Sequence, residues 1–360
     1  MKDKFGPQQA LLPQPVPRTF SDHAINGPHG IQLGVRVWPA DASDHPSEAR
    51  RAPWMLWSHG GAYSAGSHYA PPSWVVPGFT SKNIHVVSAA YRLAPHASLA
   101  EQIDDLVRAH DWCRHNLPRL LGLDKVDIDR FGVGGDSAGG THAMLLGLKL
   151  NPPPKVVVDV YGNVDLLAPH HWRHNLDVEW TNTEISLETV RENLQQPDPS
   201  DAALHAPFPW ELANIPEKTT QHRWAAPDFT YSDRVRRQTA IKDYLALSKL
   251  GIPYLVRVDH DAPLQQQQAV ARKWSPLQLL DEHTTFPPSA LLHGTADQAV
   301  PLDMSRQLAC KLRQLGVEVL ESYEDGGPHA FDQIYVGPDV PGWNEYILPV
   351  LNFAASHLNR

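Results

Sequence analysis

The sequence predicts an α/β fold built on a doubly wound, mostly parallel sheet. Strand-like and helix-like segments alternate along most of the 360 residues, an order that produces parallel strands joined by helices. Residues 54–58 and 84–90 are continuous apolar runs, which are typical of strands covered on both faces. The length suits one large domain with an insertion or two modest domains, so we expect a sizeable core.

The first half of the chain supplies most of the expected sheet. We expect strands at residues 19–25, 31–38, 54–58, 84–90, 126–133 and 155–161. A helix is expected at residues 99–116, because Ile103, Leu106, Val107 and His110 share one face. Another helix is expected at residues 138–150, directly after a strand.

The alternation resumes near the C-terminus. Residues 290–293 and 317–323 are expected strands, and residues 302–315 and 346–357 are expected helices. Each of these two strands is followed by a helix. These segments are therefore expected to complete the same sheet.

The segment between the two halves differs in character. Residues 165–285 are rich in proline and tryptophan and carry helical patterns near residues 184–193 and 232–250. A structureless loop of this length is improbable, so we expect a folded cap over the carboxyl edge of the sheet. The expected core is then residues 1–164 and 286–360. Five tryptophans of the cap are expected either to fill its core or to line an apolar pocket: Trp172, Trp180, Trp210, Trp224 and Trp274.

A lone serine lies among four glycines in FGVGGDSAGGTHAMLL, residues 131–146. Ser137 is the centre of a GxSxG pattern whose glycines are Gly135 and Gly139. Glycines permit a sharp turn between a strand and a helix, which lifts the serine Oγ clear of the backbone. The pattern alone is weak, so its assignment depends on finding a base, an acid and an oxyanion hole.

Two later loops supply the partners of this serine. A serine hydroxyl needs a base to take its proton and a carboxylate to orient that base. Asp297 follows an expected strand in HGTADQAVP, and His329 follows the last strand in YEDGGPHAFD. Asp325 and Asp332 are alternative acids, but both occupy the loop of the histidine itself. We therefore predict a catalytic set of Ser137, His329 and Asp297, in the chain order Ser, Asp, His.

The stretch LWSHGGAYSAG, residues 56–66, supplies candidate oxyanion donors. We predict that the amides of Gly60 and Gly61 donate from one side and that of Ala138 from the other. An ordinary glycine turn is the alternative. Tyr63 and Asp136 lie beside these donors in sequence, and we expect both to contact the substrate.

Composition narrows the partners. The formal charge is −9, with the charges dispersed, which argues against nucleic acid or an anionic membrane surface and favours a small neutral or apolar ligand. Cys113 and Cys310 lie in expected helices and fit buried thiols better than a disulfide, which indicates a reducing compartment. Because the sequence has no apolar run of spanning length and no secretory leader pattern, we expect a cytoplasmic protein without a membrane span. A homodimer stays open as an alternative to a monomer.

Five sequence blocks together resemble the hormone-sensitive-lipase-like branch of the α/β-hydrolase family. They are HGGAY at 59–63, AAYRLAP at 89–95, GDSAGG at 135–140, HGTAD at 293–297 and GPHAFD at 327–332. The resemblance implies an eight-stranded sheet, a mainly helical cap and an esterase of short or medium acyl esters that needs no metal and no organic cofactor. Two positions depart from the family pattern: Ala62 replaces a third glycine, and His96 replaces an acidic residue after YRLAP.

The residues and the resemblance together predict a serine hydrolase of a small hydrophobic ester, working by two-step acyl transfer. Alternatives are an amidase, a formamidase, an exopeptidase, or a lactone-processing tailoring enzyme of small-molecule biosynthesis. A non-catalytic ligand-binding member of the fold is a further alternative. A metal site at His170, His171 and His174 is the least specific of these hypotheses, because these residues form no recognisable ligand pattern.

Overall fold

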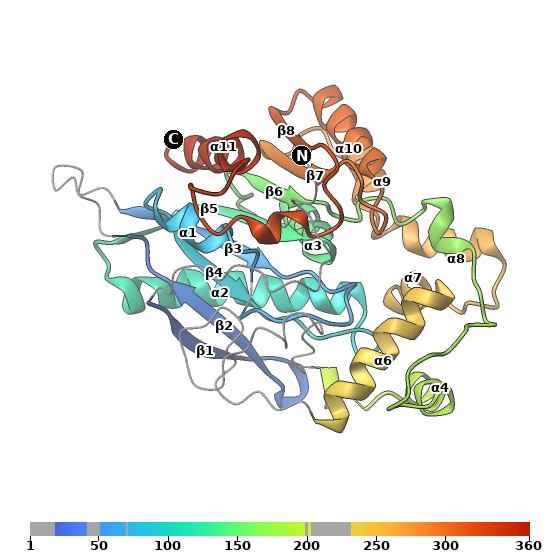
Figure 1. Ribbon diagram of the computed structural model, residues 1–360. Helices are drawn as coiled ribbons and strands as arrows, with labels where there is room; N and C mark the ends of the chain where they lie inside the picture. Colours follow the sequence, from blue (N-terminus) through green and yellow to red (C-terminus); the bar gives the residue numbers. More distant parts are fainter. Residues whose placement is uncertain (1–18, 42–50, 70, 199–200, 203–231) are drawn as a thin grey trace.

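One eight-stranded sheet runs through the centre of the molecule, with helices on both of its faces (Figure 1). The computed structural model describes residues 19–41, 51–69, 71–198, 201–202 and 232–360. The strand order is β1-β2-β4-β3-β5-β6-β7-β8. The pairs β1–β2 and β2–β4 are antiparallel, and every later pair is parallel, which confirms the predicted mostly parallel sheet.

All eight strands coincide with segments that the sequence predicted. They are β1 Ser21–Asn26, β2 Gln32–Trp38, β3 Ala52–Ser58, β4 His85–Ala89, β5 Val126–Asp136, β6 Val157–Val160, β7 Ser289–Gly294 and β8 Val319–Glu324. The main difference is β5, which continues three residues beyond the predicted end at Val133. Because Gly134 and Gly135 carry no side chain, they fit between β3 and β6 in this extension.

The helices were predicted less completely. They are α1 Val75–Thr80, α2 Leu99–Leu121, α3 Ala138–Lys149, α4 Leu187–Gln195, α6 Asp233–Ser248, α7 Gly251–Leu255, α8 Leu264–Arg272, α9 Pro276–Leu279, α10 Leu302–Gln314 and α11 Leu348–Leu358. A capping box of Ser98 and Glu101 begins α2. This helix continues past Pro118 to Leu121, five residues beyond the predicted end. The helices α1, α7, α8 and α9, which have between four and nine residues, were not predicted.

The sheet separates two hydrophobic cores. Along β3, Trp54 and Leu56 pack into the core that also holds α2 and α3 residues, while Met55 and Trp57 pack into the core on the α1 and α11 side. This alternation is the period of two expected for a strand. Burying one large apolar side chain stabilises a fold by about 1.5–3 kcal/mol, so both layers hold the sheet in place.

The helices between β6 and β7 have a small core of their own. Val190 and Leu194 of α4 pack against Ile241, Tyr244 and Leu245 of α6. Figure 1 shows α4, α6, α7 and α8 together on one side of the sheet. The sequence between β6 and β7 is therefore folded in its described parts, as expected from its length.

The described tryptophans of this region fill packing space. Trp172 is buried and donates from Nε1 to the Leu166 carbonyl at 3.0 Å. Trp180 and Trp274 are partly buried against hydrophobic clusters. Trp210 and Trp224 lie outside the described residues.

The two cysteines differ in environment. Both thiols are free, and Cys113 is buried in α2. Cys310, however, is exposed on α10, which corrects the expectation that both are buried. Its neighbour Ala309 occupies the inward face of the helix, so Cys310 points away from it. Within the described ranges, no helix has the length and apolar character needed to cross a membrane.

Candidate active site

Ser137 occupies a strained turn between β5 and α3. Its backbone angles, φ 53° and ψ −117°, are rare for a residue with a side chain. A Cβ added at Gly135 would lie 2.2 Å from the Gly139 carbonyl oxygen, and one added at Gly139 would lie 2.0 Å from that of Ser58. Both positions of the GxSxG pattern therefore require glycine, and the tight turn they permit holds the serine at the start of α3.

A chain of hydrogen bonds joins Ser137, His329 and Asp297. His329 Nε2 lies 3.2 Å from Ser137 Oγ, and His329 Nδ1 lies 2.7 Å from Asp297 Oδ2. An ionised carboxylate only accepts, so Nδ1 carries the proton and Nε2 is left to accept from the serine hydroxyl. Asp297 lies 160 positions after Ser137, and His329 lies 32 positions after Asp297. The structure brings the three together so that His329 Nε2 can accept the proton of Ser137.

The Asp297 side chain is fully buried, yet it is well supplied with donors. Its Oδ1 accepts from the amides of Ala299 at 2.8 Å and Val300 at 2.9 Å. Burial alone would raise the pKa of Asp297, but hydrogen bonds from His293 and His329 and the Val300 amide hold it well below its usual range. Asp297 therefore stays ionised at neutral pH and can orient His329.

The alternative acids have other partners. Asp332 Oδ1 accepts from the Tyr161 hydroxyl at 2.7 Å, and its Oδ2 accepts from Trp74 Nε1 at 2.8 Å. Asp325 Oδ1 accepts from Thr295 Oγ1 at 3.1 Å. The Tyr161 ring also lies with its centre 4.7 Å from that of the His329 ring. Asp332 therefore holds Tyr161, and Tyr161 in turn packs against His329.

The predicted oxyanion donors require one correction. The Gly60 amide donates at 3.1 Å to Asp136 Oδ2, so it is already engaged and does not point to a substrate oxygen. The amides of Gly61, Ala62 and Ala138 have no acceptor among the described residues. All three of these residues line the same cavity as Ser137. The amides beside Ser137 without a described acceptor are thus those of Gly61 and Ala62 in this loop and of Ala138 at the start of α3, and their role as oxyanion donors stays a prediction.

Tyr63 is buried and Asp136 is half-buried in the floor of the site. Trp57 Nε1 donates to Asp136 Oδ1 at 2.9 Å, in addition to the Gly60 amide on Oδ2. Burial and the negative charge of Asp332 raise the pKa of Asp136 to about 7. The Tyr63 hydroxyl is hydrogen-bonded to Thr141 Oγ1 at 2.8 Å. Both residues line the cavity, but their polar atoms hold the protein together, so substrate contact through them stays a prediction.

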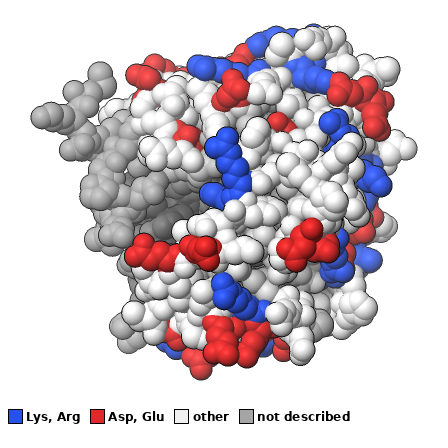
Figure 2. Space-filling view, turned by 90° about the vertical axis from the view of Figure 1, so that its right-hand side faces the viewer, with Lys and Arg blue, Asp and Glu red and all other residues white. Residues whose placement is uncertain are grey.

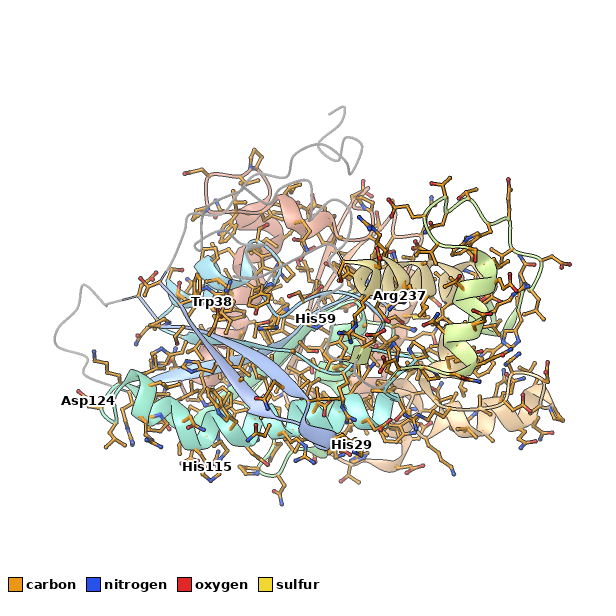
Figure 3. All side chains as sticks on the ribbon, turned by 90° about the horizontal axis from the view of Figure 1, so that it is seen from below. His29, Trp38, His59, His115, Asp124 and Arg237 are labelled. Atoms are coloured by element: carbon orange, nitrogen blue, oxygen red, sulfur yellow. The ribbon has the colours of Figure 1, made fainter. Side chains whose placement is uncertain are left out.

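A glutamine of α6 links this helix to the 59–67 loop, and it was not among the residues predicted from the sequence. Gln238 is buried, and its Nε2 donates to the Ser64 carbonyl at 2.7 Å and the Ala94 carbonyl at 2.9 Å. His96, at the position where the family has an acidic residue, lies 3.0 Å from Gln238 Oε1 through its Nε2. Figure 3 shows His59, at the start of the loop, near the middle of the molecule and Arg237 on α6 to one side.

A cavity of about 820 Å³ opens above Ser137 and His329. Its walls come from the 59–67 loop, the α6–α7 region, and residues 298–301 after Asp297. This volume suits a small molecule. Trp172, Trp180 and Trp274 are not among the lining residues, so the described tryptophans do not form the pocket.

The three histidines considered as a metal site do not converge. Among the described residues, no group of three or more His, Cys, Asp or Glu side chains could hold a metal ion. His171 Nε2 instead lies 2.9 Å from Asn163 Oδ1.

The parallel sheet, the strained serine turn and the histidine loop define an α/β-hydrolase type of protein. The chain belongs to the alpha/beta hydrolase fold family, which matches residues 55–274, and to its hormone-sensitive-lipase-like branch. The resemblance seen in the five sequence blocks is thereby confirmed.

Similar proteins include single esterases and much longer polyketide synthases. The non-reducing polyketide synthase Preu6 of Preussia isomera is 26% identical over 84% of this chain, which spans only 13% of the length of that synthase. Mouse neutral cholesterol ester hydrolase 1 is 36% identical over 32% of this chain and 28% of its own. A bacterial heroin esterase of known structure, 18% identical, superposes with a TM-score of 0.59 over 94% of this chain and 84% of its own. The last of these shows a shared fold.

Proposed function

We propose that the protein is a serine hydrolase that cleaves a carboxylic ester of a small molecule through an acyl-enzyme. The observation that carries this proposal is the hydrogen-bond chain from Asp297 through His329 to Ser137 at a substrate-sized cavity. A serine with such a base and orienting acid is activated for attack on a carbonyl. The esterase names among its relatives support the same reaction class.

The reaction begins with proton transfer from Ser137 to His329. As Oγ attacks the ester carbon, His329 Nε2 takes the hydroxyl proton, and the buried charge of Asp297 stabilises the resulting imidazolium. The carbonyl oxygen becomes an oxyanion and accepts from the amides of Gly61, Ala62 and Ala138. His329 then protonates the leaving alcohol, and the acyl group remains on Ser137.

Water completes the cycle. A water molecule replaces the alcohol and gives a proton to His329 Nε2 as it attacks the acyl carbon. The second oxyanion uses the same amides, and its collapse releases the acid and returns the proton to Ser137 Oγ. No step requires a metal or an organic cofactor, because protons and electron pairs balance among the substrate, water and these side chains.

The segment 165–285 serves as the cap in this proposal. Lys242, Leu245, Lys249 and Ile252 of the α6–α7 region line the cavity, which supports a role for this segment in substrate choice. The core then consists of residues 1–164 and 286–360. A reducing, cytoplasmic location is part of the same proposal and is supported by two free thiols.

Hydrolysis of a p-nitrophenyl ester series, from acetate to palmitate, tests the proposal. We expect turnover by the wild type and a loss of about 10⁴-fold or more in Ser137→Ala, because the triad acts as a unit. The preferred chain length measures the reach of the pocket. Turnover by Ser137→Ala at the wild-type rate would contradict the assignment.

A second candidate substrate class is an acyl derivative of small-molecule biosynthesis, such as a lactone or a thioester. It is favoured by the likeness to a polyketide synthase across 84% of the chain. The same triad opens these carbonyls by the same attack. Matched N-acetylcysteamine thioesters, lactones and ethyl esters of one acyl group distinguish the classes. If kcat/KM for the thioester or the lactone exceeds that for the ethyl ester by more than about tenfold, the protein is assigned to that substrate class instead.

A further inference from the structure

The charged side chains of the cavity differ in sign from the molecule as a whole. The chain carries a net charge of −9. Among the described lining residues, the Lys and Arg side chains are Lys242 and Lys249, both from the α6 side, and the one Asp or Glu is Asp136 in the floor. Figure 2 views the molecule from the side of these helices and shows both Lys or Arg and Asp or Glu side chains around a hollow of the surface. The two lining lysines therefore both lie at the α6 end of the cavity.

The two lysines are not equivalent. Lys242 Nζ lies 2.6 Å from Asp243 Oδ1, so its charge is already paired. Lys249 caps the C-terminal end of α6 with a left-handed backbone, φ 61°, and is exposed. No ion pair to Lys249 occurs within the described part of the chain. Its ammonium group is thus available to a ligand in the cavity.

Two histidines line the same cavity as Lys249. Burial and the charge of Lys249 lower the pKa of His170 against the opposing charge of Asp165, and burial, His170 and Lys249 lower the pKa of His171 to about 3. Both rings are therefore neutral at pH 7. His170 Nε2 is buried and so does not face the cavity, and His171 Nε2 is occupied by Asn163. The positive charge at this end of the cavity therefore comes from Lys249 and not from the histidines.

We propose that Lys249 forms a carboxylate-binding subsite, so that the substrate is an ester carrying a second, free carboxylate. The ammonium group of Lys249 binds the carboxylate by charge and by a hydrogen bond to one of its oxygens. This inference rests on the proposed ester hydrolysis and adds the substrate class.

The walls between the two ends of the cavity are largely apolar. Leu245 and Ile252 line the cavity beside Lys249, and Val300 lines it on the side of Asp297. An apolar chain or ring in the substrate would pack there, with its ester at Ser137 and its carboxylate at Lys249. The inferred substrate is therefore the hydrophobic ester expected from the sequence, with one additional anionic end.

Matched esters test the inference. The p-nitrophenyl hemiesters of dicarboxylic acids, from adipate to sebacate, are compared with neutral methyl p-nitrophenyl diesters of the same acids. The ratio of kcat/KM for the charged ester over the neutral ester, each corrected for the uncatalysed hydrolysis of that ester, reports the subsite. In the wild type we expect this ratio to exceed one for at least one chain length and to fall as salt is added.

Variants of Lys249 identify the group responsible. Lys249→Gln keeps a hydrogen-bond donor but removes the positive charge, so it should lower the ratio about tenfold. Lys249→Glu should lower it further, and Lys249→Arg should restore it in part. The matched control is Lys273→Gln, at the end of α8 and away from the cavity, for which we expect the wild-type ratio. A Lys249→Gln ratio equal to that of the wild type would overturn the inference.

Two further measurements separate this inference from the proposed function. Ser137-dependent turnover of the neutral diesters tests ester hydrolysis alone, whatever the ratio. Binding of the suberate dianion to Ser137→Ala, measured by calorimetry, tests the subsite without turnover. If adding Lys249→Gln weakens suberate binding about tenfold, the subsite is supported even if no ester is cleaved. If suberate binds equally well with and without Lys249→Gln, the inference is overturned.

Discussion

The Gly60 amide donates a 3.1 Å hydrogen bond to Oδ2 of Asp136, the residue directly before Ser137. This bond fastens the loop after β3 to the end of β5. A Cβ at Gly60 would lie 2.5 Å from the same carboxylate oxygen, so the contact requires glycine. Asp136 is therefore a positioning residue: it holds the loop whose next amides, those of Gly61 and Ala62, face the cavity.

Removing the Asp136 carboxylate should impair the site. Asp136→Ala leaves the buried Gly60 and Trp57 donors without an acceptor, which costs about 1–3 kcal/mol for each. We expect kcat to fall by about tenfold or more, because the oxyanion amides lose their support, while KM changes less. Asp136→Asn keeps one acceptor oxygen and should lose less activity. Steady-state kinetics with circular dichroism as a folding control checks this order.

The same carboxyl gives a pH dependence of stability. Burial raises the pKa of Asp136 from 3.8 to about 7, so the folded state binds its proton more tightly than the unfolded state does. This contribution to stability is complete below pH 4 and is lost as pH rises through 7. Asp159, whose pKa burial raises to about 6, acts in the same direction.

Comparison with Asp136→Asn isolates this titration. The wild type loses about 1.4 kcal/mol for each pH unit over which only the folded state holds the proton. The variant lacks this loss, so its Tm relative to that of the wild type should rise by about 3 °C between pH 5 and pH 8. Thermal unfolding at several pH values measures the difference. A constant difference would show that Asp136 is ionised throughout.

Relieving the strain at Ser137 should stabilise the fold. A residue with a side chain in such a backbone conformation costs on the order of 1–3 kcal/mol, and glycine avoids most of this cost. Ser137→Gly should therefore unfold at a higher temperature than Ser137→Ala, although both are inactive. Equal unfolding temperatures would mean that the turn is not strained.

Gln238 should affect activity although it does not contact Ser137 or His329. Its Nε2 holds the Ser64 and Ala94 carbonyls, so Gln238→Ala leaves two buried acceptors without this donor and frees α6 from the oxyanion loop. We expect a loss of stability of about 2 kcal/mol and a higher KM, because α6 also forms one wall of the cavity. Thr239→Ala, on the same helix, loses only a bond within α6 and serves as the control. Equal effects of the two variants would refute the tie.

The strands and the serine turn could be predicted because their signals are local. Apolar runs mark β3 and β4, and the glycines around Ser137 fit only a tight turn. The engagement of Gly60 could not be predicted, because it depends on Asp136, which is 76 positions away and pairs with it across neighbouring strands. Gln238 gave no signal for the same reason: its partners lie in loops of the core. The short helices α7 to α9 were not predicted, because their ends are set by packing against the rest of the fold.

Covalent labelling tests the central claim, that Ser137 is the nucleophile activated by His329, most directly. The wild type, Ser137→Ala and His329→Ala are treated with a fluorophosphonate and examined by intact mass and peptide mapping. The account predicts one adduct per chain on Ser137 in the wild type, none in Ser137→Ala and much slower labelling in His329→Ala. An adduct at another residue, or wild-type labelling in Ser137→Ala, would contradict it.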